Sequence, residues 1–157
     1  MRLAAFEPDI PQNLGGMIRL CACFGVPLDV IEPCGFPFSV RALKRAAMDY
    51  ADQAEITHHD SWSDFEATRQ GRLVLFTTKA QDSLWEFNFS KGDTLLMGRE
   101  SAGVPDSVHN SADHRVCLPM AAGTRSLNVS MMAGIALAEA LRQTDHWRTA
   151  GRLAGLD

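Results

Sequence analysis

The sequence lacks any long hydrophobic run. No stretch among its 157 residues approaches the roughly 20 consecutive apolar residues that cross a bilayer. The N-terminus, MRLAAFEPDIP, places a carboxylate and two prolines directly after a short apolar run, so it lacks the apolar core of a signal peptide. These absences predict a soluble, cytoplasmic protein with no membrane partner.

The cysteine spacing of a metal site is also missing. The four cysteines form no C-x-x-C pair, and Cys21 and Cys23, two residues apart, would face different sides of a helix. The other two are Cys34 and Cys117. Small buried apolar side chains in a reducing compartment are the ordinary interpretation of such cysteines. We therefore expect no bound metal.

Positive charge is scarce, with a formal net charge of −4 at pH 7. A general electrostatic grip on nucleic acid needs many Lys or Arg side chains near phosphates, so any RNA site must be a local patch. Arg41, Lys44 and Arg45 have the spacing that places three cations on one helical face. From charge alone, a solvated helix face is the favoured interpretation of this spacing over RNA contact.

Common nucleotide-binding signatures are incomplete. Residues 98–103, GRESAG, have the glycine spacing of a phosphate loop, but Val104 and Pro105 follow where Lys and then Ser or Thr are needed. No G-x-G-x-x-G turn follows the first expected strand, which argues against a dinucleotide fold. His58 and His59 are adjacent and would point to opposite faces of a strand, so we interpret them as surface histidines.

The pattern that is present alternates strands with helices. Short apolar runs bounded by Pro, Gly or charges predict buried strands, and stretches with helical spacing lie between them. Such alternation predicts one α/β domain over residues 1–157, with a mainly parallel sheet flanked by helices. The expected strands are 3–6, 28–31, 73–77, 94–97 and 115–118, with 54–57 as a weaker sixth, and the expected helices are 14–24, 40–50, 63–70 and 104–112.

The last expected helix has the clearest periodicity. An apolar stripe recurs at three and four residues from Val129 to Leu141. Small residues on this helix, such as Gly134 and Ala136, permit close approach of another helix, either within the fold or across a dimer.

Three polar segments follow predicted strands, at the sheet edge where open α/β sheets bind ligands. Taken singly, each has an ordinary interpretation: Asn13 as a helix cap, Glu100 as an exposed carboxylate, and Ser126, Asn128 and Ser130 as caps. The segments are PQNLGGMIR at 11–19, LLMGRESAGVP at 95–105 and LPMAAGTRSLNVS at 118–130.

Together and in this order, the segments resemble motifs 1, 2 and 3 of the SPOUT superfamily of RNA methyltransferases. The resemblance covers essentially the whole chain and includes KRAAMDY at 44–50 and FTTK at 76–79. It is closest to the minimal branch that methylates the ribose of the tRNA wobble nucleotide. The resemblance implies a C-terminal deep trefoil knot, which the residues alone would not predict because knots are rare exceptions.

The resemblance also implies the cofactor and the partners. S-adenosylmethionine (AdoMet) would bind in the knot and leave as S-adenosylhomocysteine, and the enzyme would act as a homodimer on the anticodon stem-loop of tRNA. By matching position to position, the residues implied to bind AdoMet are Phe76, Thr77, Met97, Gly98, Leu118, Met120, Ser126 and Leu127.

The implied catalytic residues come from all three motifs. Arg19 corresponds to the proposed activator that reaches the partner subunit's site, and because guanidinium does not deprotonate near neutrality we expect it to orient phosphate and stabilise alkoxide character. The identity of the base stays open. The positions implied to order Arg19 and place the ribose are Asn13, Glu100, Ser126 and Asn128.

The chain departs from the usual motif 2 at two positions. Arg99 stands where proline is usual and Ala102 where arginine is usual, which bears on substrate choice more than on chemistry. Two alternatives therefore accompany wobble methylation: a 2′-O-methyltransferase for another ribose in tRNA or ribosomal RNA, and a catalytically idle knotted dimer that binds AdoMet or RNA. The joint presence of all five implied catalytic residues disfavours the idle dimer.

Overall fold

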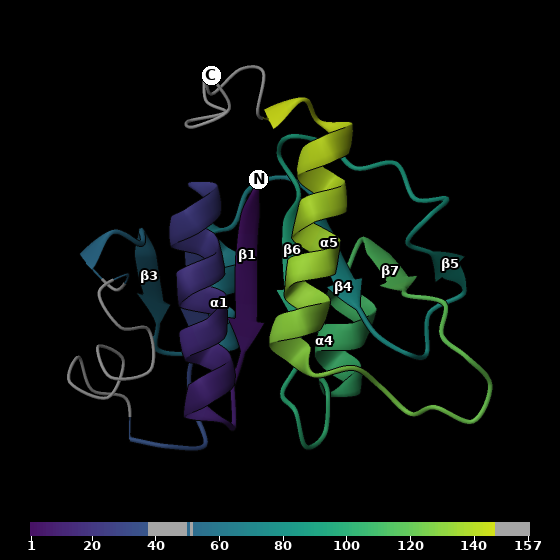
Figure 1. The fold of residues 1–157 in the computed structure, drawn as a ribbon. Helices are drawn as coiled ribbons and strands as arrows, with labels where there is room; N and C mark the ends of the chain where they lie inside the picture. Colours follow the sequence, from purple (N-terminus) through teal and green to yellow (C-terminus); the bar gives the residue numbers. More distant parts are fainter. Residues whose placement is uncertain (38–49, 51, 147–157) are drawn as a thin grey trace.

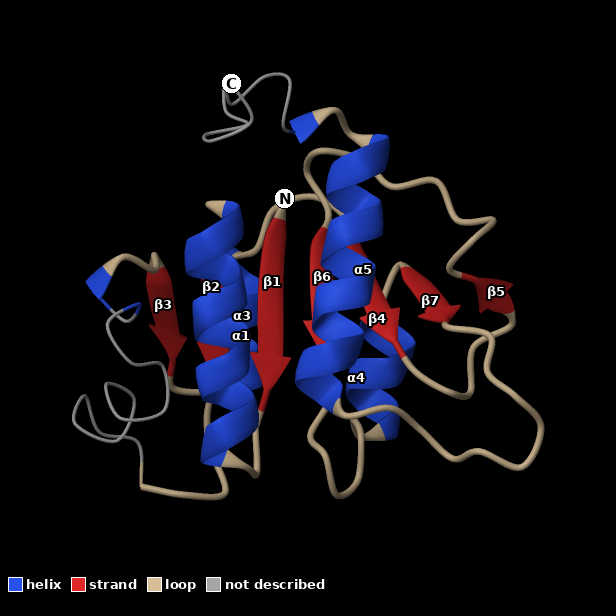
Figure 2. Cartoon of the chain, viewed as in Figure 1, coloured by secondary structure: helices blue, strands red, loops and turns tan. Residues whose placement is uncertain are grey.

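A computed structural model describes residues 1–37, 50 and 52–146, in which seven strands form one sheet (Figures 1 and 2). The strand order is β3-β2-β1-β6-β4-β7-β5, and every strand pair is parallel. The predicted α/β class with a parallel sheet is confirmed. The strands are β1 (Arg2–Phe6), β2 (Leu28–Ile31), β3 (Ile56–His59), β4 (Leu73–Phe76), β5 (Asp82–Ser83), β6 (Thr94–Met97) and β7 (His114–Cys117).

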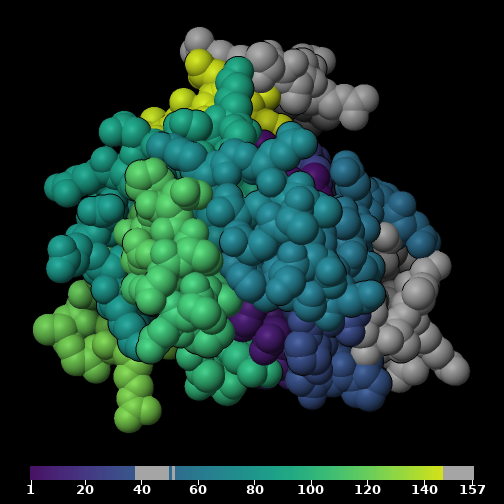
Figure 3. Space-filling model, turned by 180° about the vertical axis from the view of Figure 1, so that it is seen from behind, coloured from purple at the N-terminus to yellow at the C-terminus, as the bar shows by residue number. Residues whose placement is uncertain are grey.

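Helices cover both faces of the sheet, as continuous apolar strands require. On one face α1 (Pro11–Phe24) and α5 (Val129–Gln143) lie side by side (Figure 1), and on the other are α3 (Trp62–Thr68) and α4 (Asp106–Ser111), the face seen in Figure 3. Successive residues of β1 alternate between the two cores: Leu3 packs with the α1 and α5 side chains, and Ala4 with Phe65 of α3.

Helix α1 is bounded by local backbone chemistry. Pro11 occupies its first turn, where the missing N–H costs nothing, and Gly25 ends it in a left-handed conformation with φ of 62°. The amide N–H groups of Gly25 and Val26 bond to carbonyls of the last turn. These signals place α1 directly after β1, so that its first residues lie at the carboxyl edge of the sheet.

Between β7 and α5, residues 118–128 pass from the β7 side of the sheet back to the α1 side (Figure 1). There α5 packs against α1 closely: a Cβ at Gly16 would lie 3.1 Å from the Cβ of Ser130. Ala133, Ala136 and Ala140 of the last helix are buried in the core of the single chain, so these small residues serve packing within this fold, one of the two expected uses.

Several details differ from the sequence-based expectations. The weak strand at 54–57 lies at Ile56–His59, and the two-residue strand Asp82–Ser83 was not predicted. The interpretation of both histidines as surface residues is wrong for His59, which is buried and whose Nε2 lies 2.8 Å from Asp29 Oδ1. Arg41, Lys44 and Arg45, and the expected helix 40–50 apart from Tyr50, lie outside the described residues. No helix in the described part of the chain has the length and apolar character to cross a membrane.

Candidate active site

A pocket of about 600 Å³ opens at the carboxyl edge of the sheet. Its walls come from the ends of β4, β6 and β7 and from the loops that follow them, residues 77–79, 98–104 and 118–128, closed on one side by the start of α1. This is the edge where parallel α/β sheets bind ligands. The volume is within the range of about 300–1,000 Å³ that is usual for small-molecule sites.

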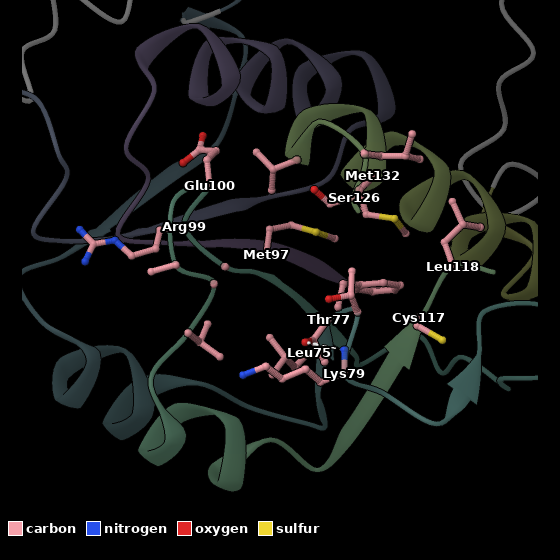
Figure 4. Close-up of a pocket in the computed structure, with 18 of the residues that line it drawn as sticks. Leu75, Thr77, Lys79, Met97, Arg99, Glu100, Cys117, Leu118, Ser126 and Met132 are labelled. Carbon is pink, nitrogen blue, oxygen red and sulfur yellow. Dashed lines mark hydrogen bonds between the residues drawn. The ribbon is translucent and has the colours of Figure 1, made fainter. Parts of the chain in front are cut away.

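The pocket wall combines apolar and polar side chains. Met97 and Met132 point into it from β6 and α5, with Ser126 beside them (Figure 4). Leu118 and Phe76 add further apolar surface. All eight positions matched to AdoMet binding line this one pocket: Phe76, Thr77, Met97, Gly98, Leu118, Met120, Ser126 and Leu127.

Position 98 requires glycine because the backbone of Gly103 lies very close to it. A Cβ at this position would lie 2.8 Å from the carbonyl carbon of Gly103, closer than real Cβ contacts allow. The backbones of Arg99 and Gly103 exchange two hydrogen bonds, of 3.0 and 2.8 Å, which fold residues 99–103 into a tight loop. Gly103 completes this loop with a φ of 69°, a conformation that glycine adopts without strain. The two glycines therefore bring this backbone to the pocket wall.

Three predicted polar residues meet at one end of the pocket. Asn13 is only 7% exposed and donates from Nδ2 to Glu100 Oε1 at 2.9 Å. Asn128 donates from Nδ2 to Asn13 Oδ1 at 2.8 Å. The same Asn128 accepts at Oδ1 from the backbone N–H of Ser130 at 2.9 Å and so caps α5. One hydrogen-bonded chain thus links the three motifs.

The cap interpretation holds for Asn128 and is wrong for Asn13. Ile10 is the N-cap residue of α1 and gives no side-chain cap, while Asn13 lies inside the first turn with its amide turned to Glu100. Glu100 is half-buried and accepts two hydrogen bonds, from Asn13 and from the backbone N–H of Asp9, so it is not an ordinary solvated carboxylate.

Arg19 lies away from this pocket. It is on the exposed side of α1 and does not line the cavity of its own chain. Its guanidinium carbon lies 4.9 Å from the centroid of the Tyr50 ring, a cation–π distance. The structure of one chain therefore brings four of the five predicted catalytic residues to the pocket and leaves the arginine outside it.

Several lining residues were not predicted from the sequence. Thr78 and Lys79 follow β4 and belong to the FTTK segment at 76–79, which the resemblance includes, so their proximity to the pocket was detectable. Asp106 and His109 come from α4 and gave no sequence signal. Cys117, expected among the buried cysteines, is half-buried and lines the wall.

The described residues hold no group of three or more His, Cys, Asp or Glu side chains arranged to bind a metal ion.

Comparisons with known proteins agree with this architecture. The SpoU rRNA methylase family pattern matches residues 1–138. A tRNA (cytidine(34)-2'-O)-methyltransferase of Beijerinckia indica is 54% identical over 144 residues, 90% of each chain. A solved structure that concerns the 2-OH methylation of C/U34 on tRNA has a TM-score of 0.85 and 39% identity, covering 96% of this chain and 97% of the other. An AdoMet-bound rRNA methyltransferase from Sinorhizobium meliloti has a TM-score of 0.80 and 27% identity, covering 90% of this chain and 55% of its own.

Proposed function

The chain belongs to the SpoU rRNA methylase family, and from that premise we propose that it transfers a methyl group from AdoMet to the ribose 2′-hydroxyl of nucleotide 34, the wobble nucleotide, of tRNA. The names and coverage of its relatives support this substrate. The observation that carries the proposal is the single pocket that joins all eight implied cofactor positions to Asn13, Glu100 and Asn128.

The pocket suits AdoMet chemically. Apolar walls from Phe76, Leu118 and Leu127 fit the face of an adenine ring, and Gly98 lets backbone N–H and C=O groups come close to a ligand. When bound, AdoMet supplies an electrophilic methyl group on a sulfonium centre. The chain's own part is to enclose that centre among side chains such as Met97 and Met132 and so to exclude water.

The ribose 2′-hydroxyl must be activated before it can accept the methyl group, and the hydrogen-bonded polar residues beside the pocket are placed to assist. An alcohol is a poor nucleophile until its proton is withdrawn or its developing charge is stabilised. Asn13, Glu100 and Asn128 would fix the ribose at the pocket's polar end, with Ser126 beside them. Arg19 from a second subunit would orient a phosphate and stabilise negative charge on the ribose oxygen, since a guanidinium stays protonated.

We further propose that the working unit is a homodimer with a C-terminal trefoil knot that contacts the anticodon stem-loop. The knot is supported by the return of residues 118–128 from β7 to the α1 side. The dimer is supported by apolar side chains at the pocket rim and on α5 that are exposed in a single chain, namely Met120, Leu127 and Met131, the last 60% exposed. Burial against a second copy would remove this surface from water.

A methyl-transfer assay tests the proposed function. The purified protein is incubated with tritiated AdoMet and, in separate reactions, bulk tRNA or ribosomal RNA, and the RNA is then hydrolysed in alkali. A 2′-O-methyl group blocks cleavage of the neighbouring phosphodiester, so we expect the label in alkali-stable dinucleotides. Label in mononucleotides would indicate base methylation and contradict the proposal, and label in ribosomal RNA alone would favour the other-ribose alternative. No label in any RNA, together with intact AdoMet binding, would favour the idle dimer.

A further inference from the structure

A charged cluster lies behind the pocket wall, where the loop after β1 meets the loop after β6. Arg99 Nη1 lies 3.1 Å from Glu7 Oε2, and Arg99 Nη2 lies 3.3 Å from Asp9 Oδ1. All three side chains are half-buried. Arg99 lines the pocket together with Gly98 and Glu100, but Figure 4 shows its guanidinium pointing away from the other labelled lining side chains. Arg99 therefore acts on other residues of the chain.

Asp9 is tied to three consecutive residues of the 98–103 loop. Besides its ion pair with Arg99, its Oδ2 accepts from the backbone N–H of Ser101 at 3.1 Å and from the Ser101 hydroxyl. Its own backbone N–H donates to Glu100 Oε2 at 2.8 Å. The other oxygen of that carboxylate accepts from Asn13. The position of Asp9 thus decides where the Glu100 carboxylate stands.

The loop after β1 has little room to relax. A Cβ at Gly35 would lie 2.9 Å from Asp9 Oδ1, and the Gly35 backbone N–H bonds to the Pro8 carbonyl at 2.9 Å. Glu7 has a φ of 42°, a left-handed conformation that is costly for a residue other than glycine, and its carboxylate pairs with Arg99. The segment is held between residue 35 on one side and residues 99–101 on the other.

Charge balance makes Arg99 the central element of this cluster. Glu7 and Asp9 both pair with Arg99, which is the cation that these two carboxylates share. The Glu100 carboxylate adjoins them through its hydrogen bond from the Asp9 backbone N–H. The Ser101 hydroxyl bond and the Arg99 guanidinium hold the pKa of Asp9 below its usual range. Without the arginine, like-charge repulsion would push the two loops apart.

We propose that Arg99 and Asp9 form a clasp, defined as the Arg99, Asp9 and Ser101 contacts, which positions Glu100 for methyl transfer. The clasp rests on the proposed function of the pocket. Arg99 and Asp9 are positioning residues, since Asp9 does not line the pocket and the Arg99 guanidinium points away from it, and both act through Glu100. The arginine that departs from the usual motif 2 thereby acquires a specific structural role in this chain.

Three variants test the clasp: Arg99→Gln, Arg99→Lys and Asp9→Asn. A displaced Glu100 should lower kcat on the order of 10-fold to 100-fold, the scale of a small misplacement in an active site. The KM for tRNA and the Kd for AdoMet should stay within a few-fold. Lysine should restore part of the loss, because it keeps the charge but cannot pair with both carboxylates through a planar fork.

The matched control is Arg69→Gln. Arg69 also bridges two carboxylates, those of Glu66 and Asp113, but none of the three lines the pocket. We expect this control to keep the wild-type kcat, with any thermal destabilisation similar to that of Arg99→Gln. Equal loss of kcat in Arg69→Gln would mean that general destabilisation, and not the clasp, lowers activity.

Two further measurements separate the clasp from the function on which it rests. In a double-mutant cycle, the kcat of the Asp9→Asn/Arg99→Gln double variant should be no lower than that of the less active single variant, because both substitutions break the same clasp. The side-chain amide NMR signal of Asn13 should shift in Arg99→Gln and stay in place in Arg69→Gln. The clasp would be overturned if the wild type is active, Arg99→Gln is equally active and the Asn13 signal does not move. An inactive wild type with the Asn13 signal shifted in Arg99→Gln would instead contradict the proposed function.

Discussion

Asn128 combines two structural roles in one side chain. Its oxygen caps α5, and its amide nitrogen supplies Asn13 Oδ1 with a hydrogen-bond donor. Asn13 in turn is buried and donates to Glu100. A buried amide that loses its partner keeps the full cost of desolvation. Stability and site geometry are therefore coupled at this residue.

Replacing Asn128 should separate these two roles. Asn128→Ala removes the cap, worth about 1 kcal/mol, and orphans a buried oxygen of Asn13, which costs about 1–3 kcal/mol. Asn128→Ser keeps a cap acceptor and removes the amide donor without adding charge. Urea unfolding should show a larger loss for the alanine variant than for the serine variant. Equal stability of the alanine variant and the wild type would show that this hydrogen-bonded chain contributes nothing.

Arg19 should affect chemistry without affecting cofactor binding. Because it lies outside the pocket of its own chain, Arg19→Ala should leave AdoMet affinity within a few-fold while lowering the methyl-transfer rate on the order of 100-fold or more. Arg19→Lys should rescue poorly, since lysine lacks the planar fork. Calorimetry and single-turnover rates on the same preparation measure both quantities. A parallel loss of AdoMet affinity would place Arg19 in cofactor binding instead.

Among the elements, those with a strong local signal were predictable. Four-residue apolar runs gave β2 and β6 with their observed bounds, and the 3.6-residue spacing gave α5. Strand β5 has only Asp82 and Ser83 and exists through its pairing with β7, so no apolar run marks it. Its prediction would have required knowledge of the tertiary structure.

Contacts between distant elements were less predictable, for the same reason. The residue types of Asn13, Glu100 and Asn128 were recognised, but their hydrogen bonds join positions 87 and 115 residues apart, beyond any local pattern. The family resemblance supplied their grouping. The ion pairs of Arg99 with Glu7 and Asp9 give no signal in the sequence, where Arg99 is visible only as a departure from the usual motif 2.

The contact between α1 and α5 offers a test at the level of elements. A Cβ at Gly16 would lie 3.1 Å from the Ser130 Cβ, closer than ordinary van der Waals contact, whereas a Cβ at Gly92 has nothing within 4 Å. Gly16→Val should therefore destabilise the fold by about 1–3 kcal/mol through overpacking, and Gly92→Val should be nearly neutral. Thermal unfolding of the two variants measures the difference. Similar melting of both would show that the two helices can separate without cost.

For the whole molecule, the position of Arg19 has a consequence for assembly. A single polypeptide forms the pocket and the hydrogen-bonded series Glu100–Asn13–Asn128, but its Arg19 lies outside that pocket. A single chain also leaves Met120, Leu127 and Met131 exposed beside the pocket rim and on α5. Both features are explained if a second copy covers this region and supplies the arginine. Such a dimer would have the closed two-fold symmetry that is commonest among soluble oligomers.

A mixed dimer tests this arrangement. One subunit carries Arg19→Ala, and the other carries Gly98→Trp, which should block the cofactor pocket because even a Cβ there meets the Gly103 backbone. If Arg19 acts across the interface, the one intact pocket receives its arginine from the Gly98→Trp subunit. We expect substantial activity in the purified mixed dimer and none in either parent homodimer. A folded but inactive mixed dimer would place Arg19 in its own subunit's site.

The most direct test of the central claim is methyl transfer to RNAs that each lack a single 2′-hydroxyl. Anticodon stem-loops are prepared with a 2′-deoxynucleotide at position 34, the position named for the relatives, or at each neighbouring position, and are incubated with tritiated AdoMet. The deoxy substitution removes one acceptor and leaves the rest of the RNA unchanged. We predict that label is lost only when nucleotide 34 lacks its hydroxyl. Undiminished transfer to the RNA with 2′-deoxy at position 34 would contradict the assignment.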